Sequence, residues 1–359
     1  MNSSVKINVK NFKAWSQSES KKIYEERFDY PTSLIQVSEI EAELVAGYFY
    51  EQCYVEEATK VQNGHGNANF IIKSEMHKDY KTKSFLRIYS FGIEAAKREI
   101  AVMEIARESG VRVPKLYDLI EDAGGRVAGL FEYIEGSTLG ELLLSKEFSP
   151  LECKEIFRSL GKQVAATHKI VFRNSGLFNA SAKIDMVFEQ PANEARNRIT
   201  TLLEDNAGRR LGNHKERLIE LVDKNWSIAA QSYAKICSMN AARLVHGDLN
   251  PSNILIDRDN KVYLTDWEYS FAGNSLTDLG SLFRFEEDFT EEQYSSFIEG
   301  YKSQGLELPL TWRAAAKLLE VANLCMFLNS EEELEKTHRT AREQILSTII
   351  WFSQRESSE

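Results

Sequence analysis

The sequence has little of what defines several classes of protein. Its 359 residues include only four cysteines and six prolines, and no long apolar run. A membrane-spanning helix needs about 18 or more apolar residues in succession, so we expect no membrane partner. The cysteines share no paired spacing, which predicts free thiols in a reducing cytoplasm rather than a zinc site or disulfide framework. The amino-terminal segment also lacks the apolar core of a signal peptide.

An excess of basic residues is missing as well. The chain has 44 Lys and Arg against 54 Asp and Glu, a formal net charge of −10, which argues against nucleic acid as the main partner. This charge would suit a cationic small molecule, although many cytoplasmic proteins are equally acidic. The length exceeds that of one comfortable hydrophobic core, so we expect two lobes or domains.

The most informative stretch is residues 244–268, LVHGDLNPSNILIDRDNKVYLTDWE. Asn253 precedes one short apolar run and Asp266 follows another, with a polar, turn-like link between the runs. Two apolar runs separated by such a link predict a hairpin that brings Asn253 and Asp266 together. An amide oxygen and a carboxylate are suitable ligands for Mg²⁺. Asp248, in the preceding loop, would lie beside the metal, where it can orient a hydroxyl group and accept its proton.

These residues also follow a known pattern. His-Gly-Asp at 246–248 with Asn253 has the order and spacing of the protein-kinase catalytic loop, with Gly247 in place of an arginine. Asp266 is followed by Trp rather than by Phe-Gly. Together these features resemble the aminoglycoside phosphotransferase and choline kinase family. In that family an aspartate at the position of Asp278 helps to hold the active-site loops.

The resemblance implies both a fold and an activity. The expected fold is α+β and protein kinase-like, with a small lobe of antiparallel sheet plus one helix and a large, mainly helical lobe that contains the catalytic hairpin. We expect an extension at residues 1–37, a nucleotide-binding lobe at 38–135 and a catalytic, acceptor-binding lobe at 136–359. The expected activity is Mg²⁺-dependent transfer of the γ-phosphoryl group of ATP to a small-molecule hydroxyl group. Its catalytic residues would be Asp248, Asn253 and Asp266.

The segment before the hairpin predicts the small lobe. A helix is expected from Ser38, as its N-cap, to about residue 50. Three strands of one antiparallel sheet are then expected at residues 54–61, 69–73 and 84–89.

The turn between the first two of these strands contains two glycines, Gly64 and Gly66. Glycines let a backbone approach phosphate closely, although such a turn is often no more than a hairpin. The resemblance implies that this turn covers the nucleotide, with Asn69 in place of the third glycine of protein kinases.

Arg87 is a lone basic residue inside the apolar third strand. Protein kinases carry a lysine here, which holds the α- and β-phosphates and pairs with a helix glutamate. Members of the resembled family often carry arginine, and the implied partner is Glu99 in a helix expected at residues 93–109. The alternative is an exposed surface pair. A forked guanidinium can bind phosphate in place of lysine, with different geometry.

Two further strands, at 115–121 and 127–133, lead to a segment that resembles the hinge between the kinase lobes. Backbone groups around Glu132, Tyr133 and Ile134 would then meet the edge of the adenine. Because main-chain recognition leaves little side-chain signature, ATP rather than GTP is only the default nucleotide.

Beyond Gly136 the chain is expected to be helical except at the catalytic hairpin. His168, in a helix expected from Pro150 to about residue 171, is interpreted as a packed, hydrogen-bonded core histidine rather than a catalyst. Other helices are expected at residues 192–206, 215–238, 290–304, 311–328 and 331–354.

The acceptor stays open at this point. Acidic residues at 285–292 and 331–333 could hold the ammonium groups of an aminoglycoside, but acids at helix starts are more simply explained by the helix dipole. The candidates are an antibiotic-resistance phosphotransferase, a metabolic kinase of choline, homoserine or a sugar, and a catalytically weak kinase-like binding protein. A protein kinase is disfavoured by Gly247 and by the short segment between Asp266 and Asp278. Monomer and homodimer are equally open.

Overall fold

The computed structural model of the chain describes residues 36–50, 54–61, 66–76, 80–145, 149–237 and 241–356. Apart from its last two residues, the expected extension at 1–37 lies outside these ranges, as does Gly64.

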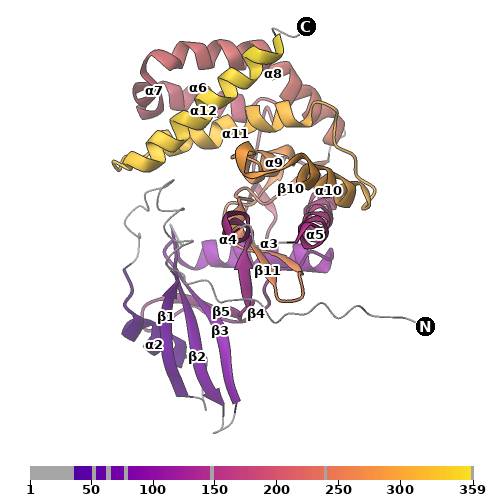
Figure 1. Cartoon of the computed structure of the whole chain (residues 1–359). Coiled ribbons are helices and arrows are strands. Elements are labelled where there is room, and N and C mark those ends of the chain that lie inside the picture. The colour runs from indigo at the N-terminus through magenta and orange to yellow at the C-terminus, as the bar shows by residue number, and fades with distance from the viewer. Residues whose placement is uncertain are drawn as a thin grey trace, which may run out of the picture.

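The first lobe is built on a five-stranded sheet of order β1-β2-β3-β5-β4 (Figure 1). Every neighbouring pair of its strands is antiparallel. All five strands predicted before Gly136 are present, and the last two join the same sheet as the first three. The strands are β1 (Tyr54–Val61), β2 (Ala68–Met76), β3 (Tyr80–Tyr89), β4 (Leu116–Ile120) and β5 (Val127–Glu132).

Two helices accompany this sheet, α2 (Glu39–Gly47) and α3 (Gly92–Glu108). The predicted N-cap of α2 is confirmed, because the Ser38 hydroxyl accepts a hydrogen bond from the Glu41 backbone N–H at 3.1 Å. The helix ends three residues earlier than expected. Its Ala42 and Val45 are buried in the small apolar core of this lobe.

The alternation of side chains along β2 and β3 positions the site. Successive side chains of a strand point to opposite faces. When one face packs into the apolar core, the other face is available for polar residues of the site. Asn69 and Arg87 are paired across the two strands and belong to that second face. The fully buried apolar residues of the first face are Phe70, Ile72, Leu86 and Ile88.

The second lobe is mainly helical. Figure 1 shows α6, α7, α8, α11 and α12 gathered at the end of the molecule far from the first sheet, with α4, α5, α9 and α10 nearer its middle. Short 3₁₀ turns lie at Gly212–His214, Pro251–Asn253 and Glu286–Asp288. The helices are α4 (Leu139–Ser145), α5 (Pro150–Lys169), α6 (Glu194–Leu203), α7 (Asn206–Leu211), α8 (Lys215–Ile236), α9 (Leu276–Leu282), α10 (Glu291–Lys302), α11 (Trp312–Leu328) and α12 (Glu335–Glu356).

The expectation that the chain beyond Gly136 is helical except at the hairpin is wrong. A second five-stranded sheet runs through this lobe in the order β7-β10-β13-β8-β9. Its strands are only two to four residues long, too short to show a period-2 pattern. Apart from β8 and β9, which follow one another in the chain, they pair with partners far away in the sequence. They are β7 (Val171–Phe172), β8 (Gly176–Phe178), β9 (Ile184–Val187), β10 (Ala242–Val245) and β13 (Phe271–Gly273).

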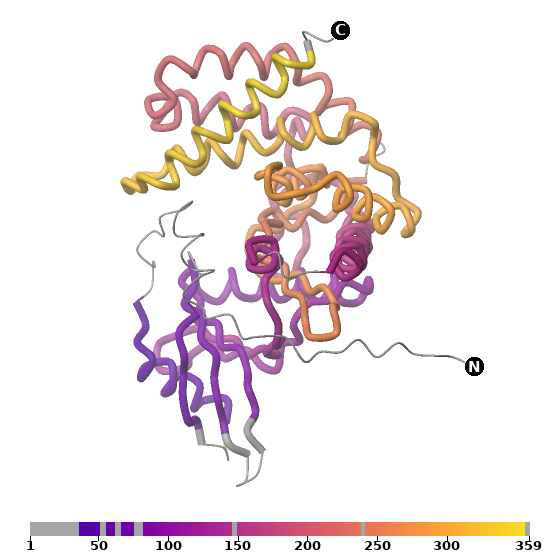
Figure 2. The backbone as a smooth tube through the Cα atoms, viewed as in Figure 1, coloured from indigo at the N-terminus to yellow at the C-terminus, as the bar shows by residue number. Residues whose placement is uncertain are grey.

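The predicted catalytic hairpin is confirmed as β11 (Ile254–Asp257) and β12 (Val262–Leu264), paired antiparallel. A third strand, β6 (Gly136–Thr138), pairs with the other edge of β11. A Cβ on Gly136 would lie 2.0 Å from the Ile256 carbonyl oxygen, so only glycine allows this close pairing. In Figure 2 the orange hairpin segment lies between the violet strands of the first sheet and the yellow C-terminal helix.

One expected helix start is displaced. Residues 331–333 were expected to begin the last helix, but α12 begins at Glu335. The three glutamates therefore belong to the preceding loop, where the Ser330 hydroxyl accepts a hydrogen bond from the Glu332 backbone N–H at 3.2 Å. The helix dipole does not explain their position, and two of them line the cavity described below.

Candidate active site

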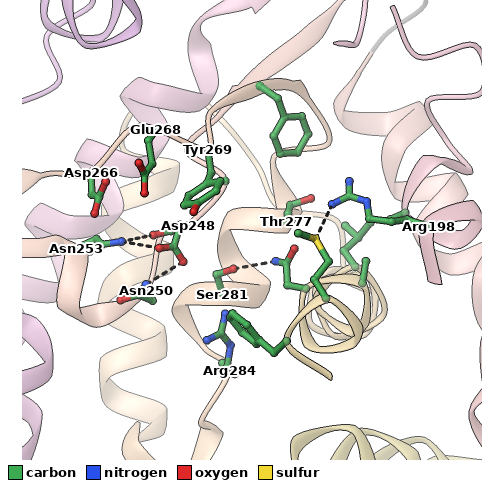
Figure 3. A pocket seen from close by; sticks show the side chains of 18 of the residues that line it. Arg198, Asp248, Asn250, Asn253, Asp266, Glu268, Tyr269, Thr277, Ser281 and Arg284 are labelled. Carbon is green, nitrogen blue, oxygen red and sulfur yellow. Dashed lines mark hydrogen bonds between the residues drawn. The ribbon is translucent and has the colours of Figure 1, made fainter. Parts of the chain in front are cut away.

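Asp248 is held by two amide side chains. The Asn253 Nδ2 donates to Asp248 Oδ2 at 2.9 Å and also to the Asp248 carbonyl oxygen, while Asn250 Nδ2 donates to Asp248 Oδ1 at 2.9 Å. Figure 3 shows the Asp248 carboxylate between these two amides, with Asp266 and Glu268 nearby. Because both of its oxygens accept hydrogen bonds, the orientation of the carboxylate is set before any ligand is present.

The hairpin brings Asn253 and Asp266 to one site, as its sequence predicted. The backbone N–H of Thr265 donates to the Asn253 carbonyl oxygen at 2.9 Å, which connects the two ends of the hairpin. Asp266 has a φ of +66°, in the left-handed region that costs a non-glycine residue free energy. Both side chains line the same cavity as Asp248.

Arg87 joins the first sheet to the hairpin. Its Nη1 contacts Glu99 Oε1 at 2.8 Å and its Nη2 contacts Asp266 Oδ1 at 2.6 Å. A third carboxylate, Glu268, has its Oε2 3.7 Å from the same Nη2. Arg87 and Glu99 are both buried, so the alternative of an exposed surface pair is wrong.

Burial and mutual attraction set the ionisation of this cluster. Burial alone would lower the pKa of Arg87, but Asp266 and Glu99 outweigh it and raise that pKa well above its usual value. Burial raises the pKa of Glu99, and Arg87 opposes the rise. Burial, followed by the charge of Asp266, raises the pKa of Glu268 to about 7, again against the effect of Arg87.

Glu268 and Asn67 are site residues that sequence reasoning missed. Asn67 Nδ2 donates to Glu268 Oε2 at 2.8 Å, and Asn67 Oδ1 accepts from the Ser90 backbone N–H at 3.0 Å. The Ser90 hydroxyl in turn donates to the Gly66 carbonyl oxygen. The glycine-containing turn is thereby connected to the catalytic hairpin. The available signal was a second carboxylate two residues after Asp266 in the sequence Thr-Asp-Trp-Glu.

Asp278 holds the start of the catalytic loop. Its carboxylate accepts from the backbone N–H groups of His246, at 2.9 Å, and Gly247, at 3.0 Å. It also contacts His168 Nε2 at 3.0 Å, and His168 Nδ1 lies 3.0 Å from the Tyr301 hydroxyl. His168 is therefore the packed, hydrogen-bonded core histidine that the sequence predicted, and Asp278 has the position implied by the resemblance.

Gly247 cannot be replaced by a larger residue without movement of the backbone. Its φ is +85°, and a Cβ there would lie 2.2 Å from the Tyr269 carbonyl oxygen. An arginine at this position, as in the protein-kinase loop, is excluded by the same contact. The neighbouring His246 donates from Nε2 to the Thr265 carbonyl oxygen at 2.9 Å, and its ring packs against Trp267.

The expected adenine contacts lie apart from this cluster. Glu132 Oε2 accepts from the Lys115 backbone N–H at 3.2 Å, and Lys83 Nζ lies 5.2 Å from the centre of the Tyr133 ring. Glu132, Tyr133 and Ile134 are half-buried and do not line the cavity that contains Asp248. Their role, like that of Gly64, stays a prediction.

Beside Asp248 is a cavity of about 740 Å³. It is enclosed by the catalytic loop, the hairpin end, α4, α6, α9, α11 and the loop before α12. Most of its wall therefore comes from the helical lobe, where the sequence offered little signal.

The cluster fits a Mg²⁺ ion bound together with a nucleotide. Because Asn253 uses its Nδ2 on Asp248, its Oδ1 is the end available to a cation, and Asp266 supplies a carboxylate. Among the described residues there is no group of three or more His, Cys, Asp or Glu side chains able to bind a metal alone. Phosphate oxygens would have to complete the coordination, as is usual for Mg²⁺. Arg87 Nε, buried and without a hydrogen-bond partner in the described part of the chain, fits an anionic ligand.

The arrangement of two lobes around this cluster is a protein kinase-like fold, shared with solved small-molecule kinases. A thermostable mutant of the aminoglycoside phosphotransferase APH(4)-Ia, in complex with ADP and hygromycin B, is 13% identical with a TM-score of 0.57, over 84% of this chain and 97% of that chain. The choline kinase LicA from Streptococcus pneumoniae is 16% identical with a TM-score of 0.58, over 86% and 98%. A spectinomycin phosphotransferase in complex with ADP and spectinomycin is 12% identical with a TM-score of 0.55, over 88% and 99%.

The chain belongs to the phosphotransferase enzyme family, which it matches over residues 57–318. The resemblance inferred from the catalytic loop is thus confirmed. No curated protein sequence is significantly similar to the chain. Within its described parts, no helix has the length and apolar character needed to cross a membrane.

Proposed function

We propose that the protein transfers the γ-phosphoryl group of ATP to a hydroxyl group of a small molecule. The observation that carries this proposal is the Asp248 carboxylate, held by Asn250 and Asn253 at the head of a large cavity and next to Asp266. Phosphoryl transfer depends chiefly on positioning and on stabilisation of charge, and these residues supply both. The complexes of solved relatives with ADP and a small-molecule acceptor support the same reading.

Asp248 is the residue that meets the acceptor. Its oriented carboxylate accepts a hydrogen bond from the acceptor hydroxyl and takes the proton late in the reaction. The acceptor oxygen forms its bond to the γ-phosphorus while the bond from that phosphorus to the β,γ-bridging oxygen breaks, and ADP leaves. Asn253 keeps Asp248 in place throughout, because it donates to both the side chain and the backbone of Asp248.

Asn253 and Asp266 would hold Mg²⁺, which when bound neutralises negative charge on the phosphates. Arg87, oriented by Glu99, is placed to contact the phosphates that are not transferred. Its guanidinium already contacts Asp266 at 2.6 Å. That contact is made through Asp266 Oδ1, so Oδ2 is the oxygen that would meet the cation.

A metabolic kinase of choline, homoserine or a sugar is a second candidate within the same reaction class. The specific support is the structural likeness to LicA and to a choline/ethanolamine kinase family protein from Mesorhizobium loti, at 16% and 17% identity. A third candidate, a catalytically weak binding protein, is favoured only by Arg87, which stands where protein kinases carry a lysine.

The test is an ADP-release assay with Mg²⁺–ATP and a panel of aminoglycosides, macrolides, choline, homoserine and sugars. The control is Asp248→Asn, which keeps the shape of the side chain but removes the charge that takes the proton. We expect turnover with one acceptor class, lost in the variant. Turnover that Asp248→Asn leaves unchanged would contradict the role of Asp248. Failure of Mg²⁺–ATP to raise the melting temperature would favour the binding-protein candidate.

A further inference from the structure

The cavity beside Asp248 exposes apolar side chains on separate elements. Leu177 of β8 is 43% exposed and Met326 of α11 is 47% exposed, and both line the cavity. Single exposed apolar side chains are common on protein surfaces, but apolar side chains gathered in one concave site are typical of a ligand-binding surface. Both residues lie on a cavity that already contains the proposed catalytic group. Their exposure is therefore accounted for if the molecule bound there is itself apolar.

Other apolar side chains also line the cavity, beside polar and charged residues. Apolar residues are contributed by α4, by the loop after β9, by β13 and by α11. They are Leu143, Leu144, Phe188, Phe271, Leu319 and Phe327. The cavity volume of about 740 Å³ lies within the range of about 300–1,000 Å³ typical of small-molecule sites. This space would take a bulky body rather than a methyl-sized group.

Two of the charged groups in the wall are cations. Arg198 Nη2 contacts Glu194 Oε1 at 3.1 Å, and Arg284 Nε donates to Glu320 Oε1 at 2.6 Å. The Arg284 guanidinium also lies over the ring of Phe327, 5.1 Å from its centre. A ligand with several ammonium groups would lie beside these two guanidinium groups, whose carboxylate partners are already used within the protein.

The carboxylates that line the cavity outnumber these two guanidinium groups, but five of the seven already have partners within the protein. The seven are Glu194, Asp248, Asp266, Glu268, Asp288, Glu331 and Glu332. Glu331 and Glu332 are exposed, where solvent and salt screen their charges. Asp288 already has an interaction partner within the protein. The acids nearest the reaction centre, Asp248 and Asp266, have hydrogen-bond and ion-pair partners of their own. The cavity thus combines an acidic reaction centre with an apolar wall.

We infer that the acceptor is an amphipathic alcohol, which places its hydroxyl group at Asp248 and a bulky apolar body against Leu177, Met326 and their neighbours. This inference rests on the proposed phosphotransferase function and narrows it. It departs from the cationic acceptor that the net charge of the chain would suit, which was one of the alternatives left open by the sequence. The lining of the cavity is itself acidic, but most of its carboxylates already have partners within the protein, so the inference rests on the apolar side chains that face the cavity.

The first test compares ligands that differ only in the apolar body. Calorimetric titration of the intact protein with n-octyl β-glucoside, below its micelle concentration, is compared with titration by methyl β-glucoside, which has the same hydroxyl groups. Kanamycin serves as the polycation. We expect octyl glucoside to bind at least tenfold more tightly than methyl glucoside and more tightly than kanamycin. Tighter binding of kanamycin, or equal binding of the two glucosides, would overturn the inference.

The second test places a charge in the wall. Leu177→Glu should weaken octyl glucoside binding at least fivefold, since it puts a carboxylate against the apolar body, whereas the same carboxylate would tighten binding of a polycation. The matched control is Leu151→Glu, at a 62% exposed position on α5 that does not line the cavity. It should leave binding within twofold of the unchanged protein. Equal effects of the two substitutions would show that octyl glucoside binds elsewhere and would contradict the proposal.

Titration with Mg²⁺–ATP in parallel separates the two proposals. If Mg²⁺–ATP binds but none of the three ligands does, the apolar acceptor is overturned and the phosphotransferase function stands. If octyl glucoside binds at the Leu177 wall but Mg²⁺–ATP does not bind, the phosphotransferase function fails, and the cavity loses its role as an acceptor site.

Discussion

The two sides of the site are built by opposite means. At the hairpin, Arg87, Glu99 and Asp266 are joined by ion pairs of 2.6 and 2.8 Å, and Asp248 is held by two amides. On the acceptor side, the wall is mostly apolar and comes from segments that are distant in the sequence. The charged side holds its side chains in fixed positions through these ion pairs and hydrogen bonds, as phosphoryl transfer requires. The second side supplies shape and an apolar surface, so it selects the acceptor without setting the reaction.

If this division is correct, changes on the charged side should alter catalysis, stability or pH dependence, and changes on the apolar side should alter only the choice of acceptor.

The largest expected effect is that of Asp248→Asn. We expect turnover to fall by about 10³-fold, since the variant cannot take the acceptor proton. The dissociation constant of Mg²⁺–ATP should stay within about threefold, because Arg87, Glu99 and Asp266 are unchanged. Single-turnover kinetics measures the rate of transfer, and calorimetry measures the dissociation constant of Mg²⁺–ATP. Parallel losses in transfer and in nucleotide binding would contradict a role of Asp248 in catalysis alone.

The next largest effect is on stability. Asp278→Asn should lower the free energy of unfolding by about 3 kcal/mol, because a neutral amide cannot serve His168 and two backbone N–H groups as the carboxylate does. Urea unfolding measures this loss in the free energy of unfolding. Asp259→Asn, in the exposed hairpin turn, is the matched control and should change stability by less than about 0.5 kcal/mol. Equal effects of the two substitutions would show that the buried network contributes nothing.

Gly247→Ala tests the close approach of the catalytic loop to Tyr269. Gly125 has the same φ of +85°, but a Cβ there would have nothing within 4 Å, so Gly125→Ala isolates the cost of the backbone conformation. Gly247→Ala adds the 2.2 Å contact with the Tyr269 carbonyl and should cost about 2 kcal/mol more than the control. It should also lower turnover. Equal thermal shifts in the two variants would mean that the loop relaxes freely.

The smallest of these effects is a pH dependence on the charged side. In the folded chain the pKa of Glu268 is about 7, against a usual value of 4.5. Because the folded state holds the proton more tightly, this stabilisation is full below pH 4.5 and is lost as the pH rises through 7. Without nucleotide or divalent cation, the stability of the chain relative to Glu268→Gln should fall by about 2 kcal/mol between pH 5 and pH 8. A pH-independent difference would contradict the raised pKa.

The same contrast explains which parts of the site could be predicted from the sequence. Asp248, Asn253 and Asp266 lie in one local hairpin and the loop before it, whose turn and apolar runs are visible within twenty-five residues. The Arg87–Glu99 pair was implied by the family resemblance, applied to a strand and the helix that follows it. Glu268 was missed because its importance comes from Asn67, which lies about two hundred residues away in the sequence.

The apolar wall could not be predicted in the same way. Leu177 lies on a three-residue strand of the second sheet, too short to show a periodic pattern. Met326 lies near the end of α11, a helix in which most of the other apolar residues are buried. Whether such side chains are packed against the protein or exposed in a cavity depends on tertiary contacts between distant segments, so the sequence left the acceptor open.

The most direct test of the division between a charged reaction centre and an apolar acceptor site is transfer of label from [γ-³²P]ATP to octyl glucoside. We expect label on the glucoside with the unchanged protein, much less with Leu177→Glu and none with Asp248→Asn. Label that appears only as inorganic phosphate, at the same rate in all three proteins, would contradict both the role of Asp248 and the apolar acceptor.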